Sequence, residues 1–284
     1  MFAYGSGVFE QDNNVDMKNN MTDFIIGVNH TRDWHTLNLE QHADHYSGLA
    51  RVTGAGGVTW CQDRWGARLY FNTLVTWRHR GRIKYGVINR QWLEEDLLQW
   101  STLYTAGRLH KPVKILECDP DLRQCLDTNL HSALTTALLL LPESFTQEQL
   151  FLTIAGLSYT GDFRMIVGED RNKVSNIVRP QMTRFRQLYS PVLDTLSDRV
   201  HCNSRGEFQQ DISDQVIYHT VCQETDVSKV NANISASCFR SYWAKTLNLR
   251  FLDKYIFVVK LSSIRTLSII IYVLIIINNV SVSR

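Results

Sequence analysis

Several features that would assign a function class directly are missing from this 284-residue sequence. Its six cysteines form no CxxC pair, so neither a zinc ribbon nor a dense disulfide framework is indicated, and we expect reduced, mostly structural thiols. The 30 Lys and Arg residues nearly balance 28 Asp and Glu residues, which gives a formal net charge of +2. We therefore expect no nucleic-acid partner, and any anion site must be local.

A long hydrophobic run is missing as well. The uncharged stretch 266–277 has twelve residues, whereas a helix that spans a bilayer needs about 20. Its isoleucine and valine content favours a strand or an interfacial segment. We expect residues 201–284 to form a divergent C-terminal tail that contacts a membrane without spanning it.

The remaining chain has the composition of a globular protein, with 44% hydrophobic and 20% charged residues. Residues 1–115 mix short β-type runs with glycine turns. We predict strands at 24–28, 68–75 and 83–88 and a helical stretch at 91–109. This is an α/β pattern, and it predicts a first domain over residues 1–115.

Residues 116–200 are predicted to form a second, mainly helical domain. An apolar stripe at helical spacing runs from Leu122 to Leu141 and is stopped by Pro142. Thr146 and Gln149 have the spacing of a capping box that opens the next helix. We assign these stripes to the hydrophobic core and give them no chemistry.

The sharpest local feature is the turn Tyr4-Gly5-Ser6-Gly7 before an apolar strand that starts at Asp23. Two glycines let the backbone approach a ligand, and their amides and the serine hydroxyl can bind phosphate oxygens. Asp23 would hold a magnesium ion on those phosphates. The alternative is an ordinary turn. A metal site of this kind usually has a second acidic residue two positions after the first, but Ile25 occupies that position here.

Two further groups carry charges suited to phosphate chemistry. Asp162 is a candidate metal ligand and Arg164 a candidate phosphate partner, although from the residues alone a charged loop with surface ion pairs is the favoured interpretation. Lys84 lies within an apolar strand, where it either faces solvent or neutralises an anion. Arg108, Lys111 and Lys114 surround Pro112 without an assigned role.

Histidines are concentrated in one short segment. Their spacing matches no metal-binding signature, so we interpret them as loop and helix-face residues. They are His30, His35, His42 and His45, accompanied by Asp33 and Asp44.

These segments together resemble the mitochondrial CDP-diacylglycerol synthases, or mitochondrial phosphatidate cytidylyltransferases, also called translocator assembly and maintenance proteins. The resemblance covers about residues 3–190. It is carried by Tyr4-Gly5-Ser6-Gly7-Val8, Asp23-Phe24, Trp34-His35, His45-Tyr46-Ser47, Ile83-Lys84-Tyr85-Gly86-Val87-Ile88, Glu95-Asp96-Leu97-Leu98, Ala106-Gly107-Arg108-Leu109, Lys111-Pro112-Val113-Lys114-Ile115, Leu141-Pro142-Glu143-Ser144-Phe145 and the stretch from Ile154 through Gly161-Asp162-Phe163-Arg164-Met165 to Asp170.

The resemblance implies an α/β fold, with a nucleotidyltransferase-like N-terminal domain joined to a winged-helix-like helical domain. It also implies Mg²⁺ dependence and peripheral attachment to the matrix side of the mitochondrial inner membrane, a lipid surface. Family members carry a presequence before the glycine turn, so we expect the authentic N-terminus to lie outside this sequence. The implied reaction joins CTP to phosphatidic acid, and its product feeds cardiolipin and phosphatidylglycerol synthesis.

Our mechanistic hypothesis is an in-line displacement at the α-phosphorus of CTP. Tyr4, Gly5, Ser6 and Gly7 bind the nucleotide and Asp23 positions the metal. Lys84 and Arg164 stabilise negative charge, and Asp162 is the second metal ligand. Two alternatives stay open: a nucleotidyltransferase with another acceptor, and a non-enzymatic assembly factor of the inner-membrane import machinery.

Overall fold

The computed structural model describes residues 1–5, 7–9, 21–77, 81–159, 172–203 and 207–210. Residues Met1–Asp211 form one compact unit, and everything below concerns this unit. Its elements in chain order are β1 (Phe2–Tyr4), β2 (Thr22–Val28), α1 (Thr31–Gln41), the 3₁₀ turn η2 (Ala43–His45), α2 (Gly48–Arg64), β3 (Leu69–Thr76), β4 (Arg82–Asn89), α3 (Arg90–Gln99), α4 (Thr105–Leu109), β5 (Lys114–Ile115), α5 (Pro120–Leu140), β6 (Ser144–Thr146), α6 (Gln147–Gly156), α8 (Lys173–Val178), η4 (Arg179–Gln181), α9 (Met182–Asp194), β7 (Val200–Cys202) and β8 (Glu207–Gln210).

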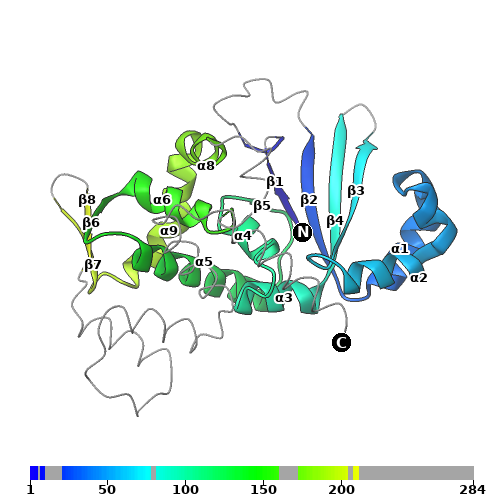
Figure 1. Ribbon diagram of the computed structural model, residues 1–284, viewed down its shortest axis with the longest axis horizontal. Helices are drawn as coiled ribbons and strands as arrows, with labels where there is room; N and C mark the ends of the chain where they lie inside the picture. Colours follow the sequence, from blue (N-terminus) through cyan, green and yellow to red (C-terminus); the bar gives the residue numbers. More distant parts are fainter. Residues whose placement is uncertain (6, 10–20, 78–80, 160–171, 204–206, 211–284) are drawn as a thin grey trace, which may run out of the picture. The chain divides into compact units, whose positions relative to one another are not determined.

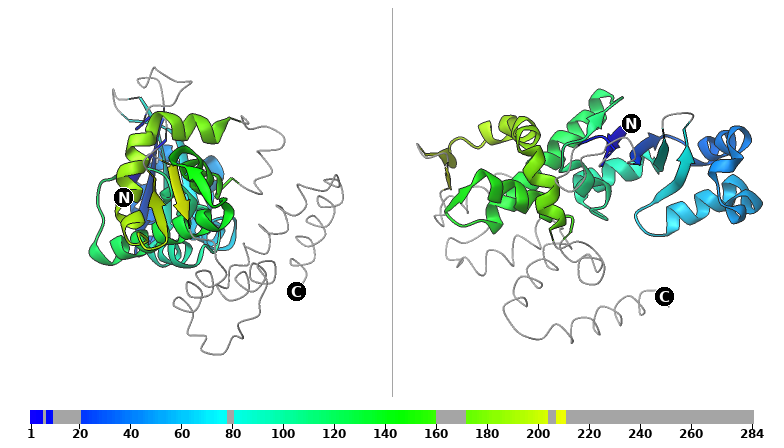
Figure 2. Two further views of the ribbon diagram at one scale, coloured as in Figure 1. Left: turned by 90° about the vertical axis from the view of Figure 1, so that its left-hand side faces the viewer. Right: turned by 90° about the horizontal axis from the view of Figure 1, so that it is seen from above.

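The larger sheet has five strands in the order β3-β4-β2-β1-β5. Its central pair, β2 and β4, is parallel, whereas β1 and β3 join antiparallel. Helices α1 and α2 lie on the β3 side of this sheet, and the later helices lie on the β1 side (Figures 1 and 2). The α/β class that the sequence predicts is therefore confirmed.

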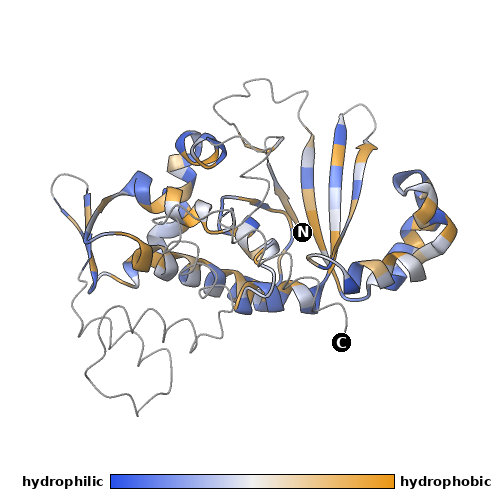
Figure 3. Cartoon of the chain, in the orientation of Figure 1, coloured by the Kyte–Doolittle hydropathy of each residue, from blue (hydrophilic) through white to orange (hydrophobic). Residues whose placement is uncertain are grey.

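The two faces of this sheet have different partners. Phe24, Tyr85 and Val87 form a core cluster on one face, against which Trp34 of α1 packs. The opposite face carries Gly27, where an added methyl group would meet Leu93 of α3 at 3.2 Å. Because side chains alternate along a strand, Asp23 and Ile25 share the face of Gly27. Hydrophilic and hydrophobic residues likewise alternate at the start of β4 (Figure 3).

The second group of elements is helical with a small antiparallel sheet, in the order β6-β8-β7. α5 covers the predicted stripe and ends before Pro142, and α6 opens with the predicted capping box of Thr146 and Gln149. Phe151 of α6 stacks on Phe185 of α9, with ring centroids 5.3 Å apart. These features agree with the predicted helical part, while the division at residue 115 stays a prediction.

The predicted helical stretch 91–109 is wrong in one respect, because it is two helices. α3 ends at Gln99, and α4 starts at Thr105. Trp100 and Leu103 between them have φ values of 52° and 56°, which no helix accommodates. The break redirects the chain so that α4 approaches the strand ends.

No helix in the described part of the chain is long and apolar enough to cross a membrane. The predicted membrane-contacting tail, 201–284, lies outside the described residues except for β7 and β8 and their flanks.

Candidate active site

A row of three polar side chains crosses the sheet. Asp23 is the register partner of Tyr4 on one side and of Lys84 on the other. Directly paired residues on neighbouring strands point to the same face. The sheet topology thus brings together Tyr4, Asp23 and Lys84, although β2 and β4 lie far apart in the sequence.

The glycine turn packs directly against this row. Gly5 has a φ of +85°, and a methyl group there would lie 3.4 Å from Oδ2 of Asp23. A methyl group on Gly7 would meet the Met21 carbonyl and the Thr22 hydroxyl at 2.7 Å. Gly5 therefore supplies a backbone conformation that side chains disfavour, and Gly7 supplies a close approach to β2. The carboxylate of Asp23 lies beside the turn, and Ser6 lies outside the described residues.

The Asp23 side chain is partly buried, and its carboxyl group is incompletely satisfied. Its Oδ1 atom has no hydrogen-bond partner among the described residues. Burial raises its pKa, whereas the charges of Lys84 and Arg108 act in the opposite direction. A buried carboxylate oxygen without a donor is a ligand that Mg²⁺ accepts, and Mg²⁺ at nucleotide sites commonly takes one or two carboxylates plus phosphate oxygens and water. The residues present fit a phosphate-bound Mg²⁺.

Lys84 is held over an aromatic ring. Its Nζ lies 4.4 Å from the centroid of Phe71 on β3. A methyl group on Gly86 would lie 2.5 Å from that same ring. The absence of a side chain at Gly86 therefore allows the Phe71 ring to lie over β4. The amino group is therefore kept on the Asp23 side of the sheet.

Arg108 is a cation of this site to which the sequence gave no role. It extends from α4, and its guanidinium carbon lies 5.0 Å from the ring centroid of Tyr4 and 5.4 Å from that of Tyr104. Burial lowers the pKa of Arg108, but the phenols of Tyr4 and Tyr104 outweigh that effect and raise it. The break between α3 and α4 aims Arg108 at the row, and periodicity gave no signal for that break.

The break itself is held by Asp96 of α3, which is only 2% exposed. Its Oδ1 accepts hydrogen bonds from the Thr102 and Leu103 amides at 2.7 and 2.8 Å. Its Oδ2 accepts from the Thr105 and Ala106 amides at 2.8 and 2.9 Å. One carboxylate thus satisfies the amides at the start of α4. Its negative charge also interacts favourably with the partial positive charge at that end of the helix.

Lys111 joins α4 to the segment after α6. Its Nζ donates hydrogen bonds to the Gly107 carbonyl and, at 2.9 Å, to Oγ of Ser158. Burial lowers its pKa well below the ordinary value, and the charges of Arg108 and Lys173 act in the same direction. Ser158 lies four residues before Asp162 in the sequence.

The predicted residues divide into two sets. The structure brings Tyr4, Gly5, Gly7, Asp23 and Lys84 together, and their catalytic roles stay predictions. Ser6, Asp162 and Arg164 lie outside the described residues.

One of the histidines belongs to the core and not to a surface. His35 is fully buried, and its Nε2 donates to Oε1 of Gln62 at 2.8 Å while its Nδ1 accepts from Oη of Tyr46 at 2.8 Å. The interpretation of His35 as a plain helix-face residue is therefore too simple, because both of its nitrogens are used inside the fold.

Comparison with known proteins gives a consistent result. The family described as "Phosphatidate cytidylyltransferase, mitochondrial" matches residues 1–248. A protein of that name from Xenopus laevis is 46% identical over 239 residues, covering 83% of this chain and 70% of the relative. Those from Bos taurus and Homo sapiens are 51% and 49% identical over 215 residues, or 75% of this chain. The alignments span 63% of the bovine protein and 47% of the human one.

Proposed function

Because this chain belongs to the mitochondrial phosphatidate cytidylyltransferase family, we propose that it transfers CMP from CTP to phosphatidic acid, forming CDP-diacylglycerol and pyrophosphate. The observation that carries this proposal is the Asp23 carboxylate beside the Gly5 turn, where the charges of Lys84 and Arg108 both act to lower its pKa. A triphosphate brings negative charge to a place that already holds the partly buried Asp23 carboxylate. Cations must therefore be present to offset both.

The proposed reaction is one in-line displacement. A phosphate oxygen of phosphatidic acid attacks the α-phosphorus of CTP and forms a new P–O bond. The bond from the α-phosphorus to the oxygen bridging to the β-phosphorus breaks, and its electron pair leaves with pyrophosphate. No covalent enzyme intermediate is needed, because the lipid phosphate is itself the nucleophile. Catalysis then consists of positioning and charge neutralisation.

Each residue of the row has a distinct task in this proposal. The Gly5 and Gly7 backbone lets the triphosphate approach β2 closely, and Ser6 adds a hydroxyl donor. Asp23 binds Mg²⁺, which neutralises phosphate charge when present. Lys84 and Arg108 donate to phosphate oxygens whose charge grows during the displacement. Asp162 and Arg164 are proposed to add a metal ligand and a cation.

The cellular setting is part of the proposal. The relatives carry the word mitochondrial in their names, and the lipid acceptor requires access to a membrane. We place the chain peripherally on the matrix side of the inner membrane, where its product would supply cardiolipin and phosphatidylglycerol synthesis.

The test uses the purified full chain with labelled CTP, Mg²⁺ and vesicles containing phosphatidic acid, and measures lipid-linked CMP. We expect Asp23→Asn to lower turnover by at least about 100-fold, because the variant loses the charge that binds the metal. Asp127→Asn, a matched change at an exposed carboxylate on α5, should retain turnover.

Parallel reactions with RNA or a protein in place of the lipid separate the other acceptors. Label in either of these and not in lipid would replace phosphatidic acid in the proposal. Near-normal turnover of Asp23→Asn would reject the metal role, and absence of label from every wild-type reaction would reject the enzymatic proposal.

A further inference from the structure

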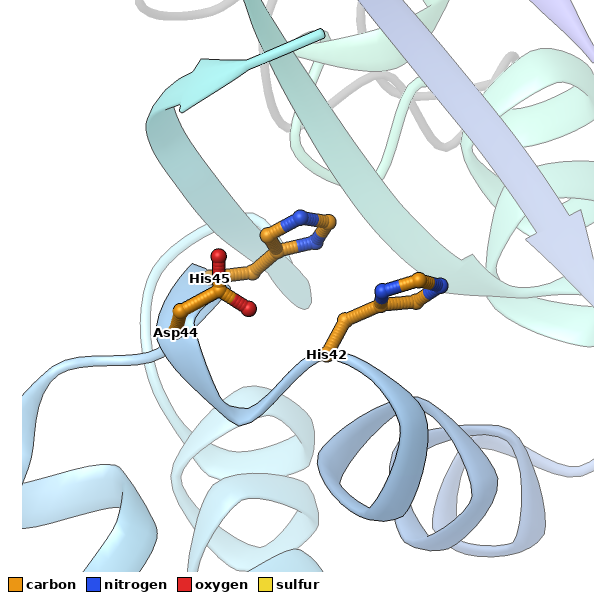
Figure 4. A group of neighbouring side chains, drawn as sticks. All are labelled: His42, Asp44 and His45. Atoms are coloured by element: carbon orange, nitrogen blue, oxygen red, sulfur yellow. The ribbon is translucent and has the colours of Figure 1, made fainter. Parts of the chain in front are cut away.

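A second group of ligand-type side chains lies on the turn that follows α1. His42 is the C-terminal cap of α1, and Asp44 and His45 belong to η2. One ligand atom from each lies within 4.8 Å of the other two. Figure 4 shows the three side chains on one short turn, beside β4. His42 and Asp44 are exposed, whereas His45 is partly buried.

This group is partly ordered by its surroundings. The rings of His42 and His45 are stacked, with centroids 4.9 Å apart and planes 8° from parallel. Nδ1 of His45 is hydrogen-bonded to Oη of Tyr85 at 2.7 Å. Tyr85 is itself fixed, because its Oη accepts from Nδ2 of Asn38 at 2.9 Å. The orientation of the His45 ring is therefore set by side chains beneath it.

The Tyr85 contact resembles the hydrogen bond that holds a metal-binding histidine in place at its other ring nitrogen. Metal-binding histidines nearly always use one ring nitrogen for the metal and donate from the other to a protein group. When Nδ1 of His45 donates to Tyr85, its Nε2 carries the lone pair that a metal requires. The tyrosine thus leaves the outward-facing nitrogen available.

The donor atoms select a class of ion. Two imidazole nitrogens and one carboxylate oxygen suit Zn²⁺ and similar transition metals, whereas Mg²⁺ and Ca²⁺ prefer oxygen alone. Bonds of about 2.0–2.1 Å to a tetrahedral ion place its ligands about 3.4 Å apart. The present separations must contract by up to about 1.4 Å, which rotation of the exposed His42 and Asp44 side chains supplies. A fourth position remains for water.

We propose that His42, Asp44 and His45 form a surface site for a divalent transition-metal ion of the Zn²⁺ type, separate from the Asp23 row. Such an ion fastens the end of α1 and η2 to β4 through the His45–Tyr85 hydrogen bond. Tyr85 follows Lys84 in β4 and points to the opposite face of the sheet. The proposal does not depend on the reaction assigned to the Asp23 row.

The experiment titrates the untagged full chain with Co²⁺ in excess Mg²⁺ and follows the visible absorption of bound Co²⁺. Zn²⁺ is then added as competitor. We expect one ion per chain, displaced by Zn²⁺ and accompanied by a higher melting temperature. The double variant His42→Ala with Asp44→Asn should lose both effects. Tyr85→Phe should weaken Co²⁺ binding by about 10–100-fold, the usual loss when the hydrogen-bond partner of a metal-binding histidine is removed.

His30→Ala is the matched control, because His30 is an exposed histidine near the same helix but outside the group. It should bind Co²⁺ like the wild type. Absence of Co²⁺ absorption in the wild type would overturn the proposal. So would absorption that persists unchanged in the double variant, since the cysteines or another site would then hold the ion.

Discussion

Asn129 and His110 are buried polar residues that fix α4, the short helix that carries Arg108. Oδ1 of Asn129 accepts from Nε1 of Trp100 at 2.8 Å and from Nε2 of His110 at 3.1 Å. Its Nδ2 donates to the Ala106 carbonyl at 3.1 Å. Because this oxygen is an acceptor, Nε2 of His110 must carry a proton. Nδ1 of His110 is buried without a hydrogen-bond partner among the described residues, which favours the neutral ring with an unprotonated Nδ1.

This arrangement makes stability depend on pH. Burial lowers the pKa of His110 from 6.5 to about 3, with the charge of Lys111 acting in the same direction. Below pH 6.5 the unfolded chain takes up a proton at this residue and the folded chain does not. The free energy of unfolding should therefore fall as the pH is lowered from 6.5 towards 3, by about 1.4 kcal/mol per unit from this residue alone.

Urea unfolding of wild type and His110→Gln at several pH values isolates this contribution. Glutamine can donate to Asn129 but does not titrate, so the difference between the two proteins should shrink steadily below pH 6.5. His201→Gln, at an exposed histidine, controls for the loss of an imidazole. Stability curves of His110→Gln that run parallel to those of the wild type would contradict the assignment.

At the scale of elements, α4 is positioned by close approach as well as by hydrogen bonds. A methyl group on Gly107 would lie 2.3 Å from Cβ of Ser158, so glycine is what lets α4 touch the segment after α6. Nothing lies within 4 Å of the corresponding position on Gly156, at the end of α6. A side chain is therefore excluded at Gly107, whereas Gly156, near the same contact, has room for one.

We expect Gly107→Ala to lower the free energy of unfolding by about 1–3 kcal/mol, the usual range for overpacking. The displaced α4 should also reduce CMP transfer, because Arg108 moves with it. Gly156→Ala should keep or raise stability by up to about 1 kcal/mol, since alanine favours helix. Chemical denaturation and the lipid-linked CMP assay measure both effects. Equal behaviour of the two variants would show that α4 tolerates the displacement.

The three longest strands, β2, β3 and β4, were predictable because their signals are local. Runs such as Phe24–Val28 and Ile83–Ile88 carry the β-branched content of strands. Likewise, the capping-box spacing of Thr146 and Gln149 marks the start of α6 within four residues. The break after Gln99 was not predictable from periodicity. Trp100 and Tyr104 continue the helical spacing. The left-handed conformations depend on side-chain partners that periodicity does not reveal, such as Asp96 for the Leu103 amide and Asn129 for Trp100.

The same contrast holds for the candidate site. The glycine turn and Asp23 are visible as a motif, whereas Arg108 and the Lys111–Ser158 contact depend on tertiary packing. His42, Asp44 and His45 have no familiar spacing, yet a short 3₁₀ turn brings their ligand atoms together.

At the scale of the whole molecule, the charges are balanced and the cations are concentrated locally. The formal net charge is only +2, yet Lys84 and Arg108 both act on the Asp23 carboxyl. Affinity for a triphosphate should therefore come from the site and not from a general field. A ligand that binds this site only in the folded state stabilises the entire unit.

Thermal unfolding with and without Mg²⁺ and CTP tests this linkage. At a CTP concentration about 100 times the dissociation constant, binding adds about 2.7 kcal/mol, or about 5–10 °C for a unit of this size. Asp23→Asn should lose the Mg²⁺-dependent part of the shift, and CTP with a chelator serves as the control. The same shift in Asp23→Asn and wild type would separate nucleotide binding from this carboxylate.

The parallel pairing of β2 with β4 has a consequence for how the protein is made. The row Tyr4–Asp23–Lys84 exists only after a long intervening stretch, including α1, α2 and β3, has been closed into a loop. Such distant pairings form late, because chain entropy opposes them until many contacts compensate. We expect a refolding chain to acquire its local helices first and the row Tyr4–Asp23–Lys84 near the end, so that recovery of enzyme activity reports completion of the sheet.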